Sequence, residues 1–186
     1  MKKETWILAG AALVIGVLLG VIIANTGGKE SAPARTATPP ASAPNVMLQQ
    51  NIQMLEEIVR KEPGNRSAWV QLGHNYFDSN QPMKAIEAYN KALEMDPNDP
   101  DVITNQGVMF RRVGWYDRAI ENFRKANEMN PFHPQSLYNL GVVYRYDLQD
   151  LDKAHQAWSR YVELHPSGQG VEQLRAELRA IEALRQ

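Results

Sequence analysis

Glycine, alanine, proline and aromatic residues recur in this chain at an interval of 34 residues. This regular spacing, called the register here, constrains the fold more than any other feature. Its glycines and prolines are Gly73, Gly107, Gly141, Pro63, Pro97 and Pro131. Its alanines are Ala85 and Ala119, then Ala92 and Ala126. Tyr76, Phe110 and Tyr144 each stand three positions after a glycine. A period of this length is typical of repeat proteins in which each unit is one supersecondary structure.

Within each unit the apolar residues follow helical spacing. In the first unit, the positions i, i+3, i+4 and i+7 are Trp69, Leu72, Gly73 and Tyr76. These positions form one stripe on a helix. Gly73 and Ala85 are small, as is required where two antiparallel helices approach closely. The spacing therefore predicts units built from pairs of antiparallel helices.

This combination of residues resembles the tetratricopeptide repeat, a helix–turn–helix unit. The resemblance covers residues 47–186 and implies an all-α fold, a tetratricopeptide-type α-solenoid. We expect this solenoid to follow a single transmembrane helix. We expect eight helices in the solenoid: one leading, six in three repeats and one capping. The corresponding ranges are 46–65 for the leading helix, 66–99, 100–133 and 134–168 for the repeats, and 169–186 for the cap.

The third unit departs from this pattern in two ways. One residue has been added between Tyr144 and Ala154, and Tyr161 stands where the other units have a small residue. We therefore expect the turn around Gln149 and Asp150 to differ from the turns of the first two units.

The segment from Thr5 to Ala24 holds 20 consecutive uncharged residues, of which eleven are Leu, Ile or Val. A helix of that length covers about 30 Å, the thickness of a bilayer's hydrocarbon core. The alternative is a cleaved secretory signal, whose apolar region normally has about 7–15 residues. We predict a cytoplasmic N-terminus over 1–4, a transmembrane signal-anchor helix over 5–24 and a Pro/Ala-rich flexible linker over 25–45.

Lys2 and Lys3 precede the span, whereas Lys29 on the far side is offset by Glu30. The positive-inside bias then keeps the N-terminus in the cytoplasm. In a bacterium, this predicts a single-pass protein of the inner membrane with its C-terminal domain in the periplasm. A stripe of small residues in the span favours a homodimer through packing of two anchors: Ala12, Gly16 and Gly20.

Composition and motifs argue against several classes of function. The net charge is −1, which does not favour a nucleic-acid partner. Cysteine is absent, so thiolate metal sites and cysteine nucleophiles are excluded. The histidines lack the spacing of a local metal site, and no catalytic or dinucleotide fingerprint occurs. We expect no cofactor, no metal and no enzymatic activity.

In tetratricopeptide proteins the first helix of each repeat lines a concave groove, so the resemblance implies a peptide-binding groove here. Its candidate residues are Gln71, His74, Asn105, Arg111, Arg112, Tyr138, Asn139 and Arg145. Asn105 and Asn139 are equivalent positions, and their amides can pair with the backbone of an extended peptide.

The three arginines of this set lie toward the same end of their helices. Because guanidinium groups bind carboxylates in a two-pronged geometry, they predict partners of acidic character. Under the alternative, the arginines cover a solvated surface or pair with acidic residues of the same domain, namely Asp78, Asp101 and Asp147.

These features predict a membrane-anchored scaffold that binds proteins or extended peptides and assists the assembly of an envelope complex. One alternative is a homo-oligomeric scaffold that organises a membrane patch. Another follows from the similarity in architecture to membrane-tethered tetratricopeptide proteins of bacterial cytochrome c maturation, which implies a factor that presents apocytochromes.

Overall fold

The structure, a computed structural model, describes residues 43–168 and 170–185. The predicted N-terminus, transmembrane helix and nearly all of the predicted linker lie outside these residues. Among the helices that the structure describes, none is long and apolar enough to cross a membrane.

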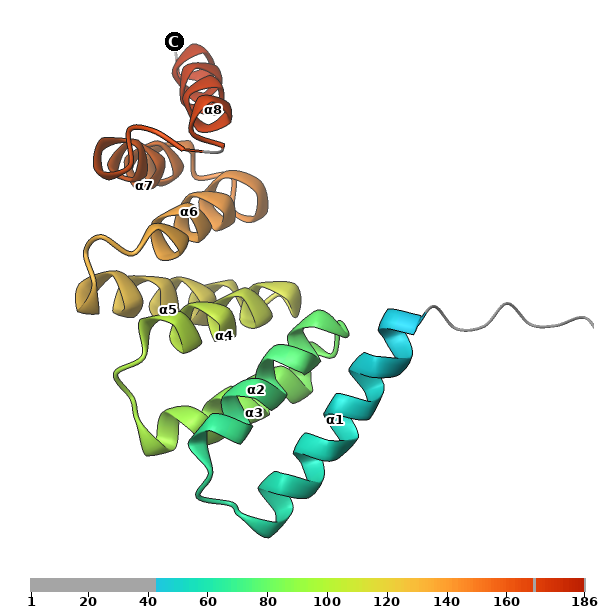
Figure 1. The fold of residues 1–186 in the computed structure, drawn as a ribbon. Coiled ribbons are helices and arrows are strands. Elements are labelled where there is room, and N and C mark those ends of the chain that lie inside the picture. The colour runs from blue at the N-terminus through green and yellow to red at the C-terminus, as the bar shows by residue number, and fades with distance from the viewer. Residues whose placement is uncertain (1–42, 169, 186) are drawn as a thin grey trace, which may run out of the picture. The chain divides into compact units, whose positions relative to one another are not determined.

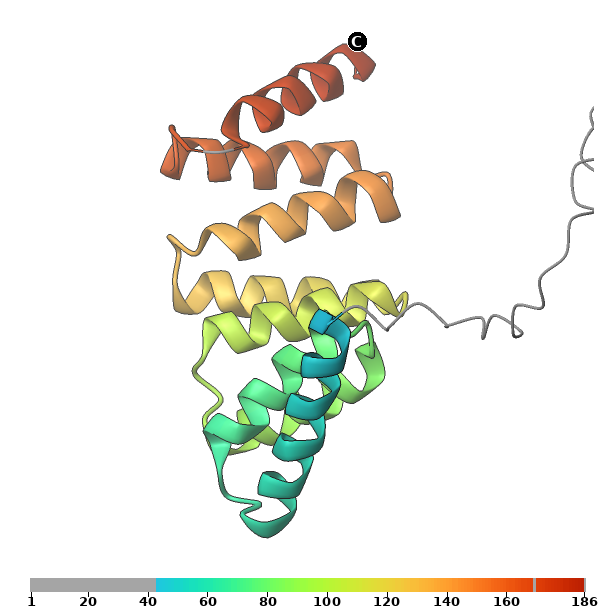
Figure 2. The same ribbon diagram turned by 45° about the vertical axis from the view of Figure 1, so that its right-hand side comes forward.

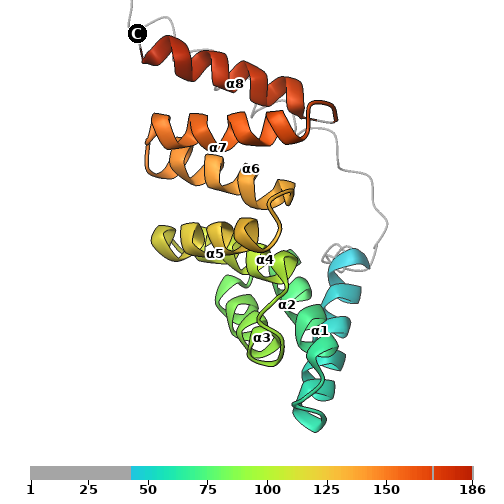
Figure 3. The same cartoon turned by 90° about the vertical axis from the view of Figure 1, so that its left-hand side faces the viewer.

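The described residues form eight α-helices and one π-helical turn, without a strand among them (Figures 1 and 3). The bounds are α1 Ala43–Lys61, α2 Arg66–Asp78, α3 Pro82–Met95, α4 Pro100–Arg112, α5 Tyr116–Met129, α6 Pro134–Val142, η1 Val143–Asp147, α7 Leu151–Leu164 and α8 Val171–Leu184. α1 begins two residues before the end of the range expected for the linker, with Pro44 in its first turn, where proline is tolerated.

Each helix packs against the next one along the chain. The closest partners are α2 with α3, α4 with α5, and α6 with α7, which are the helix pairs of the three repeats. α1 covers the first repeat and α8 covers the last. The predicted all-α, tetratricopeptide-like solenoid with eight helices is therefore confirmed for this part of the chain.

Side-chain caps fix where the first helices begin. The carboxylate of Asp99 accepts a hydrogen bond from the Val102 N–H, and Pro100 takes the next position, where a missing N–H costs nothing. His133 plays the same role before α6, since its Nδ1 accepts from the Ser136 N–H. His133 is 5% exposed, so this capping side chain is buried.

The register glycines are required because an aromatic ring lies against each of them. A Cβ atom added at Gly107 would stand 2.6 Å from the Phe123 ring, and one added at Gly141 would stand 2.1 Å from Nε1 of Trp158. Both rings are at most 1% exposed. Each glycine thus lets the second helix of its repeat place a large ring directly on the first helix.

The turn within the third repeat shares two features with the turns of the other two. One residue in each turn has a positive φ, namely Asn80 at 54°, Gly114 at 79° and Gln149 at 55°. The N–H that follows bonds the carbonyl of the aromatic residue three positions after the register glycine: Gln81 to Tyr76, Trp115 to Phe110, and Asp150 to Tyr144. These features are shared, and the expected difference lies in the residues just before Gln149, where the chain forms η1 instead of an α-helical turn.

The added residue is instead taken up inside the helix. The bond from Trp115 to Phe110 spans five positions, whereas the one from Asp150 to Tyr144 spans six. η1 lies in the longer interval, and the Leu148 N–H there bonds the Val143 carbonyl five residues back, as in a π-helix.

Candidate functional site

The eight predicted groove residues lie on the first helices of the repeats. Gln71 and His74 are on α2, Asn105 and the two adjacent arginines are on α4, and the others are on α6 and η1. The surface that α2, α4, α6 with η1, and α8 carry on this side is called the first-helix face below.

Three carboxamides occupy equivalent positions on successive first helices, 34 residues apart: Gln71, Asn105 and Asn139. Each is half-buried or exposed. Gln71 Nε2 donates to Ser67 Oγ at 3.2 Å, and Asn139 Nδ2 donates to the Gln135 carbonyl at 2.8 Å. Both bonds run back along the same helix, so neither side chain is used to join one helix to another.

Asn105 connects two repeats through His74. The distance from Asn105 Nδ2 to His74 Nε2 is 3.3 Å, and the His74 ring also meets the edge of Tyr89 at a centroid distance of 5.7 Å. The amide oxygens of all three carboxamides accept no hydrogen bond from any residue that the structure describes.

Arg111 forms an ion pair within the domain. Its Nε lies 2.5 Å from Asp147 Oδ2 and its second nitrogen 3.2 Å from Oδ1, a two-pronged geometry. The side chains are 31% and 16% exposed, so the pair is partly shielded from water. It joins α4 to η1 and neutralises Arg111.

Arg145 also has a carboxylate beside it, because its Nε lies 3.5 Å from Glu177 Oε2 on α8. Its guanidinium carbon is 5.7 Å from the centroid of the Tyr146 ring. Burial and the negative charge of Glu177 raise the pKa of the Tyr146 hydroxyl, which therefore stays protonated.

Arg112 differs from these two. Its guanidinium donates to the Phe77 carbonyl at 3.1 Å and lies over the Phe77 ring at 4.4 Å, but it forms no salt bridge with another described residue. Arg111 and Arg145 thus pair with acidic residues of the same domain, as the alternative interpretation of the sequence expected. Of the three partners expected there, only Asp147 is used, because Arg145 pairs with Glu177 instead. The preference for acidic partners stays a prediction.

The far end of the first-helix face contains a pocket that the sequence did not indicate. It lies where α6, η1 and α7 meet α8, and its lining includes Tyr138, Tyr146, Trp158, Gln173 and Glu177. Tyr138 and Tyr146 are 45% and 54% exposed. The α8 residues were missed because the helix was interpreted only as a cap. The described residues contain no group of side chains that could hold a metal ion.

Comparison with known proteins agrees with this architecture. Two family models, both described as tetratricopeptide repeat, match this chain, one over residues 67–99 and the other over 88–121 and 122–156. The described domain is therefore a helical-repeat structure of stacked pairs. More specifically, its residues 67–156 match tetratricopeptide repeats.

A curated relative is protein O-mannosyl-transferase TMTC3 of Mus musculus, 32% identical over 63 residues, which are 34% of this chain and 7% of that protein. The chain thus matches only a small part of its curated relatives. Among solved structures, the MamA protein superposes with a TM-score of 0.68 at 22% identity and covers 76% of this chain and 77% of its own. The first tetratricopeptide domain of Spaghetti (RPAP3), bound to the HSP90 peptide SRMEEVD, has a TM-score of 0.59 at 25% identity, with 66% and 95% covered.

Proposed function

We propose that this protein is a membrane-anchored adaptor that binds extended segments of partner proteins on its first-helix face. The tetratricopeptide fold supports protein and peptide binding, and one structure similar to this chain holds a bound peptide. The observation that carries the proposal is the row of three equivalent carboxamides, one on each first helix.

These carboxamides contribute little to the fold. Gln71 and Asn139 bond only within their own helices, and the oxygen atoms of all three are without a donor among the described residues. An extended peptide presents backbone N–H and C=O groups along its whole length, and carboxamides can both donate to and accept from such groups. A row of them therefore fits a backbone whatever its sequence.

The anchor part of the proposal rests on the 20 uncharged residues of segment 5–24 and on the lysines before it. Tethering raises the local concentration of partners at the membrane, so weak contacts on the first-helix face suffice. In a bacterium this places an adaptor for envelope assembly in the periplasm, attached to the inner membrane.

Photo-crosslinking in cells tests the binding surface. A photoreactive amino acid replaces Asn105 or Asn139 in the full chain, and Glu121, exposed on the second helix α5, is the matched control. We expect discrete adducts from the first two positions and few from the control. Equal adducts from all three positions would exclude the first-helix face as the binding surface.

A double variant separates binding from folding. Asn105→Ala with Asn139→Ala removes two members of the row, and both positions are only half-buried. We expect the free energy of unfolding to change by no more than about 1 kcal/mol, the size of a typical hydrogen bond, because the variant removes no core contact. Capture of the crosslinked partners should fall sharply, and undiminished capture would contradict the proposal.

A further inference from the structure

The turns within the three repeats lie along one edge of the stack, and the connections between repeats lie along the opposite edge (Figure 2). α1 begins at the first of these edges, and α8 ends there. An ion pair of 2.7 Å between Arg185, just after α8, and Asp152, in the first turn of α7, fixes the end of α8 at this position. We call this the turn edge. Residues 1–42 join the described domain at the turn edge.

More of the exposed large apolar side chains lie at the turn edge than at the opposite edge, which has Met95, Met129 and Phe132. Six at the turn edge are at least 40% exposed: Val46, Met47, Met83, Trp115, Leu148 and Leu184. Trp115 and Leu148 belong to the turns within the second and third repeats, and Met83 lies in the first turn of α3. Val46 and Met47 lie near the start of α1, and Leu184 is the last residue of α8. Exposed apolar side chains that stand singly need no explanation, but a row along one edge marks an interaction surface.

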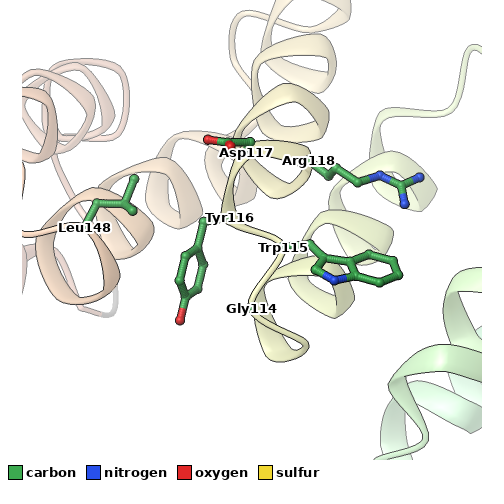
Figure 4. Close-up of a pocket in the computed structure, with 6 residues that line it drawn as sticks. All are labelled: Gly114, Trp115, Tyr116, Asp117, Arg118 and Leu148. Carbon is green, nitrogen blue, oxygen red and sulfur yellow. The ribbon is translucent and has the colours of Figure 1, made fainter.

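The residues around Trp115 have the character of a bilayer interface. Trp115, Tyr116 and Leu148 line one pocket, between the turn after α4 and the turn after η1 (Figure 4). The Arg118 guanidinium lies 4.0 Å from the centroid of the Phe110 ring and 5.2 Å from that of Trp115. Tryptophan and tyrosine with a nearby cation are enriched at the level of lipid headgroups.

The charges of the turn edge are compatible with phospholipid headgroups. Lys84, Arg112 and Arg118 are held there by contacts with aromatic rings and form no salt bridge with a described residue. Asp78 and Asp117 are the acidic residues of this edge that are likewise outside any described salt bridge. Among the charged side chains of this edge that form no salt bridge with a described residue, three are positive and two are negative. The edge therefore has no net negative charge that would repel an anionic membrane.

The predicted linker is short enough to keep this edge close to the predicted anchor. Residues 25–42 separate the apolar segment from α1, and 18 residues of random coil span about 25 Å. We infer that the turn edge rests on the surface of the bilayer that segment 5–24 anchors. The helices then stand upright on the membrane, and the first-helix face opens sideways above it. This inference rests on the proposed anchor.

The absence of cysteine allows a direct test in the full chain. Met83→Cys and Leu148→Cys each place a nitroxide label on the turn edge, and Phe132→Cys places one on the opposite edge, where Phe132 is 64% exposed. The proteins are reconstituted in vesicles of phosphatidylcholine and phosphatidylglycerol. Collisions of the label with oxygen and with a water-soluble nickel chelate are measured by electron paramagnetic resonance.

We expect both turn-edge labels to lose most of their nickel collisions and gain oxygen collisions in vesicles, while the label at Phe132→Cys stays accessible to nickel. If the chain co-sediments with the vesicles and all three labels remain accessible, the anchor holds and the inference is wrong. If it does not co-sediment, both fail. Loss of nickel contact with spin–spin broadening at Leu148→Cys would place a second copy on this edge and also overturn the inference.

Discussion

Replacing Gly141 with alanine tests whether the register glycines are required by packing. Gly141 lies on α6 against Trp158, which is 1% exposed. The added Cβ would stand 2.1 Å from Nε1 of Trp158 and 2.2 Å from the neighbouring ring carbon. The ring must therefore move, and the hydrogen bond of 3.0 Å that Nε1 donates to the Tyr138 carbonyl must lengthen or break.

The expected cost follows from three contributions. Overpacking a filled core costs about 1–3 kcal/mol. Loss of the Trp158 hydrogen bond adds about 0.5–1.5 kcal/mol. The better helix propensity of alanine offsets about 1 kcal/mol of this. We expect Gly141→Ala to lower the free energy of unfolding by about 2 kcal/mol, which corresponds to a melting temperature lower by about 4–8 °C.

Urea and thermal unfolding followed by circular dichroism measure this cost. Gly64→Ala is the matched control, because a Cβ there would meet nothing within 4 Å, and it should change the free energy of unfolding by less than about 0.5 kcal/mol. In the background of Trp158→Leu, the alanine at 141 should cost less by at least about 1 kcal/mol. Equal stability of Gly141→Ala and Gly64→Ala, or an unchanged cost in that background, would refute the reasoning.

Two further predictions concern charged side chains. Burial opposes the charge of Asp99, but a backbone N–H and the Arg66 guanidinium outweigh it and lower the pKa of the carboxyl. Asp99→Ala should therefore cost about 1–2 kcal/mol in urea unfolding at pH 7, and this difference should disappear as the pH falls below 3.8, where the wild-type carboxyl becomes protonated. Arg111→Met leaves the shielded Asp147 without its partner and should cost about 1–2 kcal/mol in the same assay. Arg112→Met, which breaks no ion pair, should cost less than half of that, and equal costs would contradict the structural difference between the two arginines.

The sequence was sufficient to predict the helix pairs because small and large residues recur at fixed intervals where the two helices pack. A large ring on the second helix requires a glycine opposite it on the first helix, and the rings at these points are Tyr89, Phe123 and Trp158. The same register located the carboxamides of the first-helix face. Contacts that repeat in every unit are therefore predictable from spacing alone.

The π turn was not predictable in this way. Spacing shows that one residue has been added between Tyr144 and Ala154, but both a helix and a turn can take up one residue. The structure keeps the positive φ, at Gln149, and the closing bond to the aromatic residue, from Asp150 to Tyr144, and these features preserve the close approach of α7 to α6. The π turn therefore changes only the local hydrogen bonding of the helix. A longer turn would instead displace the Trp158 ring from its position against α6.

The added residue also bears on how the first-helix face recognises its partners. η1 ends at Asp147, and this side chain neutralises Arg111. Arg145, in the same turn, lies beside Glu177. Two of the three arginines that favoured an acidic ligand are thus matched by carboxylates of the domain, and a ligand would have to displace those carboxylates to use them. The carboxamides meet no such competition, because their oxygens are without donors among the described residues. Recognition through the peptide backbone therefore requires less rearrangement of this surface than recognition through charge.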